Sequence, residues 1–177
     1  LRRIAIAGSS ITLTGVIHLF TAQQNRRLTD ALVALDAAVV DEQGQVVAIN
    51  VAGTSFGDAE MNQLQYENLA ALQELQLTAS RVTDAGMAQL KQLTSLERLF
   101  IAKCSISDVG LAHVKNLPEL RVLNIYGTQI TSAGLEHLSG LKNLRTLYIT
   151  DLKFKPAAVD RLKQQLPDLK VTDYTAE

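Results

Sequence analysis

Few residues of this 177-residue chain have side chains that could do chemistry. Cys104 is the sole cysteine, which excludes an internal disulfide and a cysteine-rich zinc site. His113 and His137 are 24 residues apart in the sequence. A metal ion needs three or four protein ligands, and the equivalent positions, Gln63 and Gln89, hold only weak ones. We therefore expect a buried cysteine, two surface histidines and neither a metal nor a cofactor.

Motifs and composition exclude several classes of function. The sequence has no CxxCH haem attachment, no glycine-rich dinucleotide or phosphate loop, no GxSxG and no HExxH. Seventeen Lys and Arg against eighteen Asp and Glu give a net charge of −1, which provides no electrostatic footprint for nucleic acid. Apolar residues make up 47% of the chain, but only 5% is aromatic. We expect a non-catalytic protein with an aliphatic core and no catalytic residues.

A repeat organises the chain. From residue 69 onward, apolar residues recur with a period of 24 residues. Four units open on a leucine, at Leu69, Leu93, Leu117 and Leu141. A looser copy precedes them, from Ile49 to Leu64, and a truncated copy follows, from Leu166 to Val171. Because one unit cannot bury its leucines alone, we expect the units to stack.

Each unit predicts one strand and one short helix. The L-x-L core of a unit alternates, which predicts a short strand with one buried face. A hydroxyl residue follows and is a natural helix N-cap, and an Asp after it suits the helix N-terminus. These caps are Thr83, Ser107 and Thr131. A glycine is unfavourable inside a helix, so its recurrence at residues 86, 110 and 134 indicates close packing against a neighbouring coil.

The pattern LxxLxxLxLxxTxITxAGLxxL resembles leucine-rich repeats of the ribonuclease-inhibitor-like type, over about residues 37 to 171. Its 24-residue form with T-D-A-G resembles bacterial repeat proteins of planctomycete-like lineages. Cys104 holds the strand-end position that usually carries Asn or Cys, and Ser80, Thr128 and Leu152 replace it elsewhere. The resemblance implies an α/β leucine-rich-repeat solenoid: a right-handed horseshoe segment with a parallel sheet on the concave side and short helices on the convex side. It implies little about function.

The two ends of the repeat array call for caps. Residues 38–40 and 46–49 flank Asp41-Glu42-Gln43-Gly44, which predicts a hairpin leading into the first repeat strand. At the other end we expect a longer helix, a stop near Pro167 and a short closing strand. The predicted organisation is an N-terminal helical segment (1–30), an N-terminal cap with a hairpin (31–48), and the repeats with a C-terminal cap (49–177).

The N-terminal helical segment differs in composition from the rest of the chain. Residues 4–25 contain no Asp, Glu, Lys or Arg and are flanked by Arg2-Arg3 and Arg26-Arg27. As a helix they would span about 33 Å, close to the hydrocarbon thickness of a bilayer. This predicts a membrane anchor, and an amphipathic cap helix and a retained signal sequence are the alternatives. Arginine pairs on both sides leave the orientation undecided.

The candidate binding site lies on the predicted concave face. Residues that alternate with the L-x-L pair point outward and form columns across the strands. We predict that the partner-binding residues are Asn50, Glu74, Gln76, Arg98, Phe100, Asn124, Tyr126 and Tyr148. Three aromatic residues thus cluster beside Arg98, and Tyr, Phe and Arg are typical interface anchors. The alternative is that β-propensity alone places aromatic residues on strands.

Two functional hypotheses follow. The first is a non-catalytic protein–protein interaction module, membrane-anchored and binding a partner on its concave face. The second is an accessory subunit of a larger membrane complex, respiratory or ATP-synthase-like, held mainly by its N-terminal helix. The repeat proteins that the chain resembles often follow c-type cytochrome or membrane segments, which implies a membrane complex or a cytochrome-containing protein as partner. We expect membrane association, with the solenoid on the periplasmic or extracytoplasmic side, and no nucleic acid partner.

Overall fold

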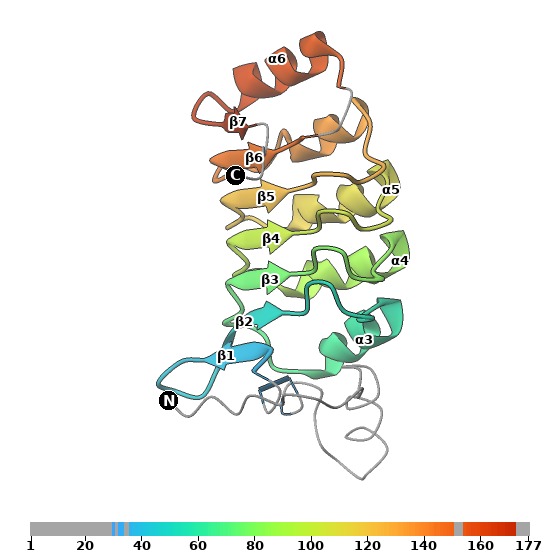
Figure 1. The fold of residues 1–177 in the computed structure, drawn as a ribbon. Coiled ribbons are helices and arrows are strands. Elements are labelled where there is room, and N and C mark those ends of the chain that lie inside the picture. The colour runs from blue at the N-terminus through green and yellow to red at the C-terminus, as the bar shows by residue number, and fades with distance from the viewer. Residues whose placement is uncertain (1–29, 31, 34–35, 151–153, 173–177) are drawn as a thin grey trace.

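The computed structural model describes residues 30, 32–33, 36–150 and 154–172. Within them the backbone forms stacked coils whose seven strands make one sheet in sequence order (Figure 1). The strands are β1 (Ala38–Val40), β2 (Val46–Asn50), β3 (Glu74–Gln76), β4 (Arg98–Phe100), β5 (Val122–Asn124), β6 (Thr146–Tyr148) and β7 (Lys170–Thr172). β1 and β2 are antiparallel, and each later pair is parallel. The predicted α/β solenoid architecture is confirmed.

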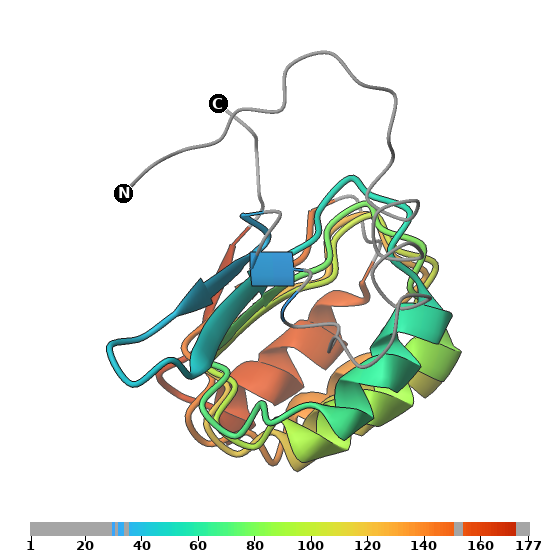
Figure 2. The ribbon, with the colours of Figure 1, turned by 90° about the horizontal axis from the view of Figure 1, so that it is seen from below.

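Helices line the side of the stack opposite the sheet (Figure 2). The α-helices are α3 (Asp58–Gln63), α4 (Asp84–Met87), α5 (Asp108–Leu111) and α6 (Pro156–Gln165). Short 3₁₀ helices continue or replace them, at Leu64–Tyr66, Ala88–Gln92, Ala112–Asn116 and Gly134–Leu138. The predicted N-caps are present at Thr83 and Ser107, whose side chains accept hydrogen bonds from Ala85 N and Val109 N. Thr131 accepts the corresponding hydrogen bond from Ala133 N at 3.2 Å, and the short helix that follows it is a 3₁₀ helix that begins at Gly134.

The repeat period sets the strand register. Leu75, Leu99, Leu123 and Leu147 lie directly opposite one another in β3 to β6. All four side chains are buried, and the second apolar position of each repeat continues the same core. Burying one such leucine contributes about 1.5–3 kcal/mol, so the repeated column accounts for much of the stability of the stack.

Aspartates join successive coils on the helical side. The Asp58 carboxylate accepts hydrogen bonds from Thr83 N (2.8 Å), Thr83 Oγ1 (2.6 Å) and Gly86 N (3.0 Å) of the next coil. A Cβ added at Gly86 would lie 2.5 Å from Asp58 Oδ1, so only glycine lets the carboxylate approach this closely. The predicted close packing of these glycines is therefore confirmed, and the aspartate of one coil caps the helix of the next.

Both predicted cap structures are present. β1 and β2 form the hairpin, with Gly44 in its turn at φ +75°, and β2 also begins the parallel sheet. α6 begins at Pro156, ends at Gln165 and is followed by the closing strand β7. The helices in the described part of the chain all lack the length and apolar character that crossing a bilayer requires. The predicted anchor, residues 4–25, lies outside the described residues, as does Leu152.

Candidate functional site

The side of the sheet that points away from the helices, termed here the sheet face, carries the predicted binding residues. Asn50 ends β2, Glu74 and Gln76 flank the buried Leu75 in β3, and Arg98 and Phe100 occupy the same positions in β4. The remaining three are Asn124 in β5, Tyr126 two residues after it, and Tyr148 in β6. Each strand pairs with the next in the register that the 24-residue period predicts, so the side chains form columns.

Five of the eight predicted residues line one open pocket of about 390 Å³ on the sheet face. They are Gln76, Phe100, Asn124, Tyr126 and Tyr148. The other lining residues, Ala52, Thr78, Ala102 and Lys103, come from the segments that follow the strands. Phe100 and Tyr148 are two strands apart, a distance of about 10 Å, with Asn124 between them. The two aromatic residues are therefore placed to act as opposite walls of the pocket.

Asn124 is buried, which corrects the prediction that it projects outward with the rest of its column. Only 8% of its surface is exposed. Its Oδ1 accepts a hydrogen bond from Tyr126 N (3.0 Å), which folds the short side chain back against its own strand. Asn50 makes the equivalent bond to Ala52 N (3.1 Å) but remains exposed. Because Asn124 lies low between two larger neighbours, it forms the floor of the pocket.

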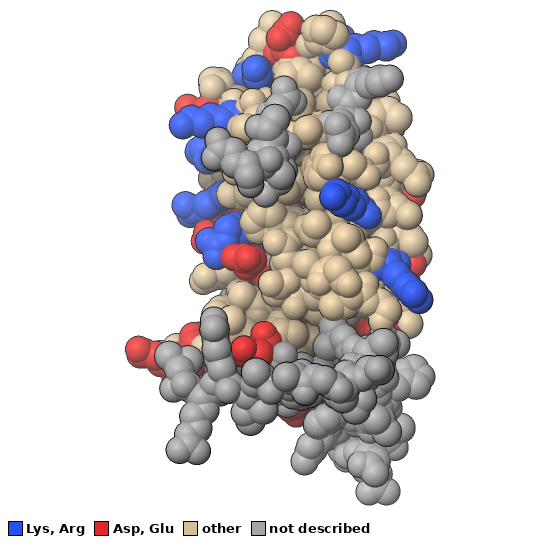
Figure 3. All heavy atoms as spheres, in the orientation of Figure 1, with Lys and Arg blue, Asp and Glu red and all other residues tan. Residues whose placement is uncertain are grey.

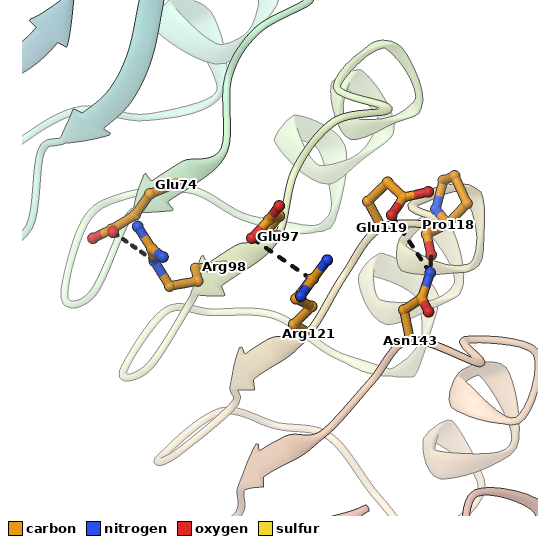
Figure 4. A network of polar contacts seen from close by, with 7 residues as sticks. All are labelled: Glu74, Glu97, Arg98, Pro118, Glu119, Arg121 and Asn143. Atoms are coloured by element: carbon orange, nitrogen blue, oxygen red, sulfur yellow. Dashed lines mark hydrogen bonds and ion pairs between the residues drawn. The ribbon is translucent and has the colours of Figure 1, made fainter. Parts of the chain in front are cut away.

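Glu74, Arg98 and Asn50 lie outside the pocket lining, at or toward the rim of the sheet face. Arg98 Nε is 2.8 Å from Glu74 Oε2. A second ion pair joins the next pair of coils, where Arg121 Nε is 3.6 Å from Glu97 Oε2 (Figure 4). Basic side chains gather along this edge, where the strands begin, and the middle of the sheet face is mainly uncharged (Figure 3). Exposed ion pairs of this kind stabilise a fold little, so their main effect is on the charge of the rim.

Lys103 lines the pocket and is absent from the predicted binding residues. It belongs to the loop after β4, and its Nζ lies 5.2 Å from the centroid of the Tyr126 ring. Its φ is +57°, and the equivalent residues of neighbouring coils, Gly53, Ala79 and Gly127, also have positive φ. A signal was present in the sequence, because a lysine stands where three other repeats carry glycine or alanine.

Cys104, His113 and His137, the other residues whose side chains could do chemistry, do not line this pocket. Cys104 is buried, and its Sγ donates to Leu77 O at 3.1 Å. His113 and His137 lie in 3₁₀ helices on the helical side of the stack. The described residues contain no group of three or more His, Cys, Asp or Glu that could hold a metal ion. A second pocket of about 340 Å³ lies between α6 and the 3₁₀ helix Gly134–Leu138, where Arg161 and Glu136 form an ion pair.

Stacked coils of this kind define a solenoid repeat protein. The family model described as leucine rich repeat matches residues 94–151, which lie within the stacked coils. Domains of this class are generally non-catalytic modules that bind proteins. No curated protein matches the chain by sequence.

Three solved structures illustrate the similarity of fold. An internalin (inlF) from Listeria monocytogenes is 25% identical, with a TM-score of 0.53 over 65% of this chain and 31% of its own. The PEPR1–AtPEP1 structure is 17% identical, with a TM-score of 0.55 over 88% of this chain and 22% of its own. Leiomodin-1 actin-binding site 2 is 15% identical, with a TM-score of 0.52 over 67% of this chain and 79% of its own. The chain spans less than a third of the internalin and of PEPR1.

Proposed function

We propose that this chain binds a segment of a protein partner in the pocket on its sheet face. The observation that carries the proposal is the convergence of Phe100, Tyr126 and Tyr148, from three successive coils, on one pocket of about 390 Å³. Aromatic side chains in such a pocket are typical binding anchors because they provide a large contact area at low entropic cost.

The distribution of aromatic residues argues against β-propensity as the whole explanation. In β4, β5 and β6 the inward position is a buried leucine each time, and the aromatic residues of these strands occupy the outward positions only. Packing volume favours leucine inside the stack, but it places no requirement for aromatic rings on the solvent side. A partner that buries Phe100 and Tyr148 would explain why aromatic residues occupy these outward positions.

Structures with this fold support a binding role. PEPR1 was solved as PEPR1–AtPEP1, and a plant peptide hormone receptor, RGFR1, was solved in complex with RGF2. The leiomodin-1 structure is of an actin-binding site. Because these chains share only the fold with ours, they support the class of function, and the residues of the pocket carry the specific proposal.

A display experiment tests this function. We expect the full chain to select peptides from a random-peptide phage library, and the double variant Phe100→Ser with Tyr148→Ser to lose them while keeping its circular dichroism spectrum. The matched control replaces two helical-side residues, Val109 and His137, by Ser, and should bind as the wild type does. Failure of the wild-type chain to select any peptide, or equal binding by the pocket variant, would contradict the proposal.

We further propose that residues 4–25 attach this module to a membrane, with the solenoid on the periplasmic or extracytoplasmic side. The support is the uncharged stretch of 22 residues, long enough to span a bilayer as a helix. In an accessory subunit of a membrane complex, the same segment would be the main attachment. Detergent extraction followed by purification distinguishes the two, because a subunit co-purifies with a stoichiometric complex even when the pocket residues are replaced.

A further inference from the structure

The third residue after each of β2, β3, β4 and β5 adopts a left-handed backbone conformation. Its φ is +69° at Gly53, +56° at Ala79, +57° at Lys103 and +63° at Gly127. Every residue with a Cβ is disfavoured here, and a long side chain does nothing for the turn itself. The turn therefore does not account for a lysine at this position.

The surroundings of Lys103 direct its side chain to the pocket. A Cβ added at Gly127, in the next coil, would lie 3.3 Å from Lys103 Cγ, so the glycine leaves room for the aliphatic part of the lysine. Lys103 Nζ lies 5.2 Å from the centroid of the Tyr126 ring, a distance at which the ring attracts a cation. The position of the ammonium group at one end of the pocket is thus set by two features of the following coil.

No carboxylate in the described part of the chain neutralises this charge. Two acidic residues of the rim have their own partners, since Glu74 pairs with Arg98 and Glu97 pairs with Arg121. None of the described residues that line the pocket is acidic, and Lys103 is the one charged residue among them. The described residues that line the pocket therefore have a net positive charge, which favours an anionic group.

The two amides of the pocket present donors. Asn124 Oδ1 accepts from Tyr126 N, and a backbone N–H can only donate, so the oxygen is held there and Nδ2 remains to donate. Gln76 Oε1 accepts from Thr78 Oγ1 at 2.8 Å, which leaves its Nε2 as a donor as well. Donors on the floor and a cation at one end complement a carboxylate. With one lysine and no arginine in the lining, the site lacks the bidentate clamp typical of phosphate recognition.

We propose that the pocket recognises an acidic segment of its protein partner. An Asp or Glu side chain binds Lys103 Nζ and the amide of Asn124, and an adjacent apolar side chain packs between Phe100 and Tyr148. This inference rests on the proposed function and names the chemistry of the partner that the pocket accepts.

The test uses peptides that the full chain selects from the random-peptide phage library. We expect them to be enriched in Asp or Glu next to an apolar residue. The tightest peptide is then synthesised with each acid in turn changed to its amide, and its affinity is measured by fluorescence anisotropy. Replacing the critical acid, or Lys103→Gln, should weaken binding about tenfold, the usual value of one charge-assisted hydrogen bond.

Matched variants distinguish a direct contact between Lys103 and the peptide from a general effect of charge on binding. Lys103→Arg should keep most of the affinity, and Lys91→Gln, on the helical side, should leave it unchanged. In a double-mutant cycle, Lys103→Gln should have little further effect on the amide form of the peptide. Peptides that need Phe100 and Tyr148 but show no acid enrichment and no loss with Lys103→Gln would overturn this inference and leave the proposed function standing. If the wild-type chain selects no peptide, both fail.

Discussion

Asp84 and Ser107 belong to successive coils, and the carboxylate of Asp84 binds both the backbone and the side chain of Ser107. Ser107 N donates to Asp84 Oδ1 at 2.8 Å, and Ser107 Oγ donates to Asp84 Oδ2 at 2.6 Å. Gly110 N donates to the same Oδ1 at 3.0 Å. Asp58 and Asp108 make corresponding bonds to Thr83 and Thr131. The T-D-A-G motif is thus a connection between coils as well as the start of a helix.

Removal of this connection should destabilise the stack. We expect Asp84→Ala to lower the free energy of unfolding by about 2–3 kcal/mol, because it leaves partly buried N–H groups of the next coil without an acceptor. Urea denaturation followed by circular dichroism measures the loss. Asp160→Ala, an exposed change in α6, serves as control and should stay within about 0.5 kcal/mol of the wild type. Equal stability of the two variants would show that the carboxylate has no structural role.

The glycine that receives the aspartate provides a second test. A Cβ at Gly110 would overlap Asp84 Oδ1 and touch Ile106 Cγ2 at 3.0 Å, so Gly110→Ala must displace the carboxylate. We expect a loss of about 1–3 kcal/mol, the usual cost of overpacking. Gly140 has nothing within 4 Å of an added Cβ, and Gly140→Ala should be neutral or slightly stabilising. Thermal unfolding of the two variants distinguishes steric exclusion from a general effect of replacing glycine.

The leucine column predicts the cost of an internal cavity. Leu123 is fully buried between Leu99 and Leu147, so Leu123→Ala should destabilise by about 2–5 kcal/mol. Its neighbour Val122 lies on the sheet face, and Val122→Ala should cost less than about 1 kcal/mol. A loss at Leu123 as small as that at Val122, measured by chemical denaturation, would contradict the assigned register.

Lys103 should show a trade-off between stability and binding. Because glycine adopts a positive φ without a steric penalty, Lys103→Gly should raise the free energy of unfolding by about 0.5–1 kcal/mol, after allowance for the greater freedom of glycine in the unfolded chain. The same variant should lose affinity for the selected acidic peptide. Denaturation and anisotropy on one preparation check both effects. A destabilised variant would show that the lysine has a structural role in the turn.

Deletion of residues 1–27 should separate the solenoid from its proposed attachment. Leu32 is fully buried in the core and its carbonyl accepts from Ala37 N at 2.8 Å, so a cut before residue 28 retains the N-terminal cap. We expect the shortened chain to remain folded and to lose binding to liposomes in a flotation assay. Full-length chain that stays monomeric without detergent and does not float would contradict membrane attachment.

The pocket shows which features of the site repeat alignment can predict and which it cannot. The alternation of residues around Leu99, Leu123 and Leu147 was enough to place Phe100, Asn124 and Tyr148 in one column. It was not enough to show that Asn124 is buried, because that depends on a hydrogen bond to Tyr126 N. A repeat pattern predicts only positions that recur, and Lys103 is a departure from the repeat.

Sequence alone determined the repeat architecture of this protein: the 24-residue period specifies which strands pair, which leucines are buried and that a short helix follows each repeat strand. A solenoid allows this because each coil contacts mainly its neighbours, so a local pattern also defines the long-range contacts. Only the tertiary structure decided the contacts between side chains of different coils, such as Asp84 with Ser107 and Lys103 with Tyr126. Those contacts depend on the offset between stacked coils and on side-chain conformation, and a one-dimensional period encodes neither.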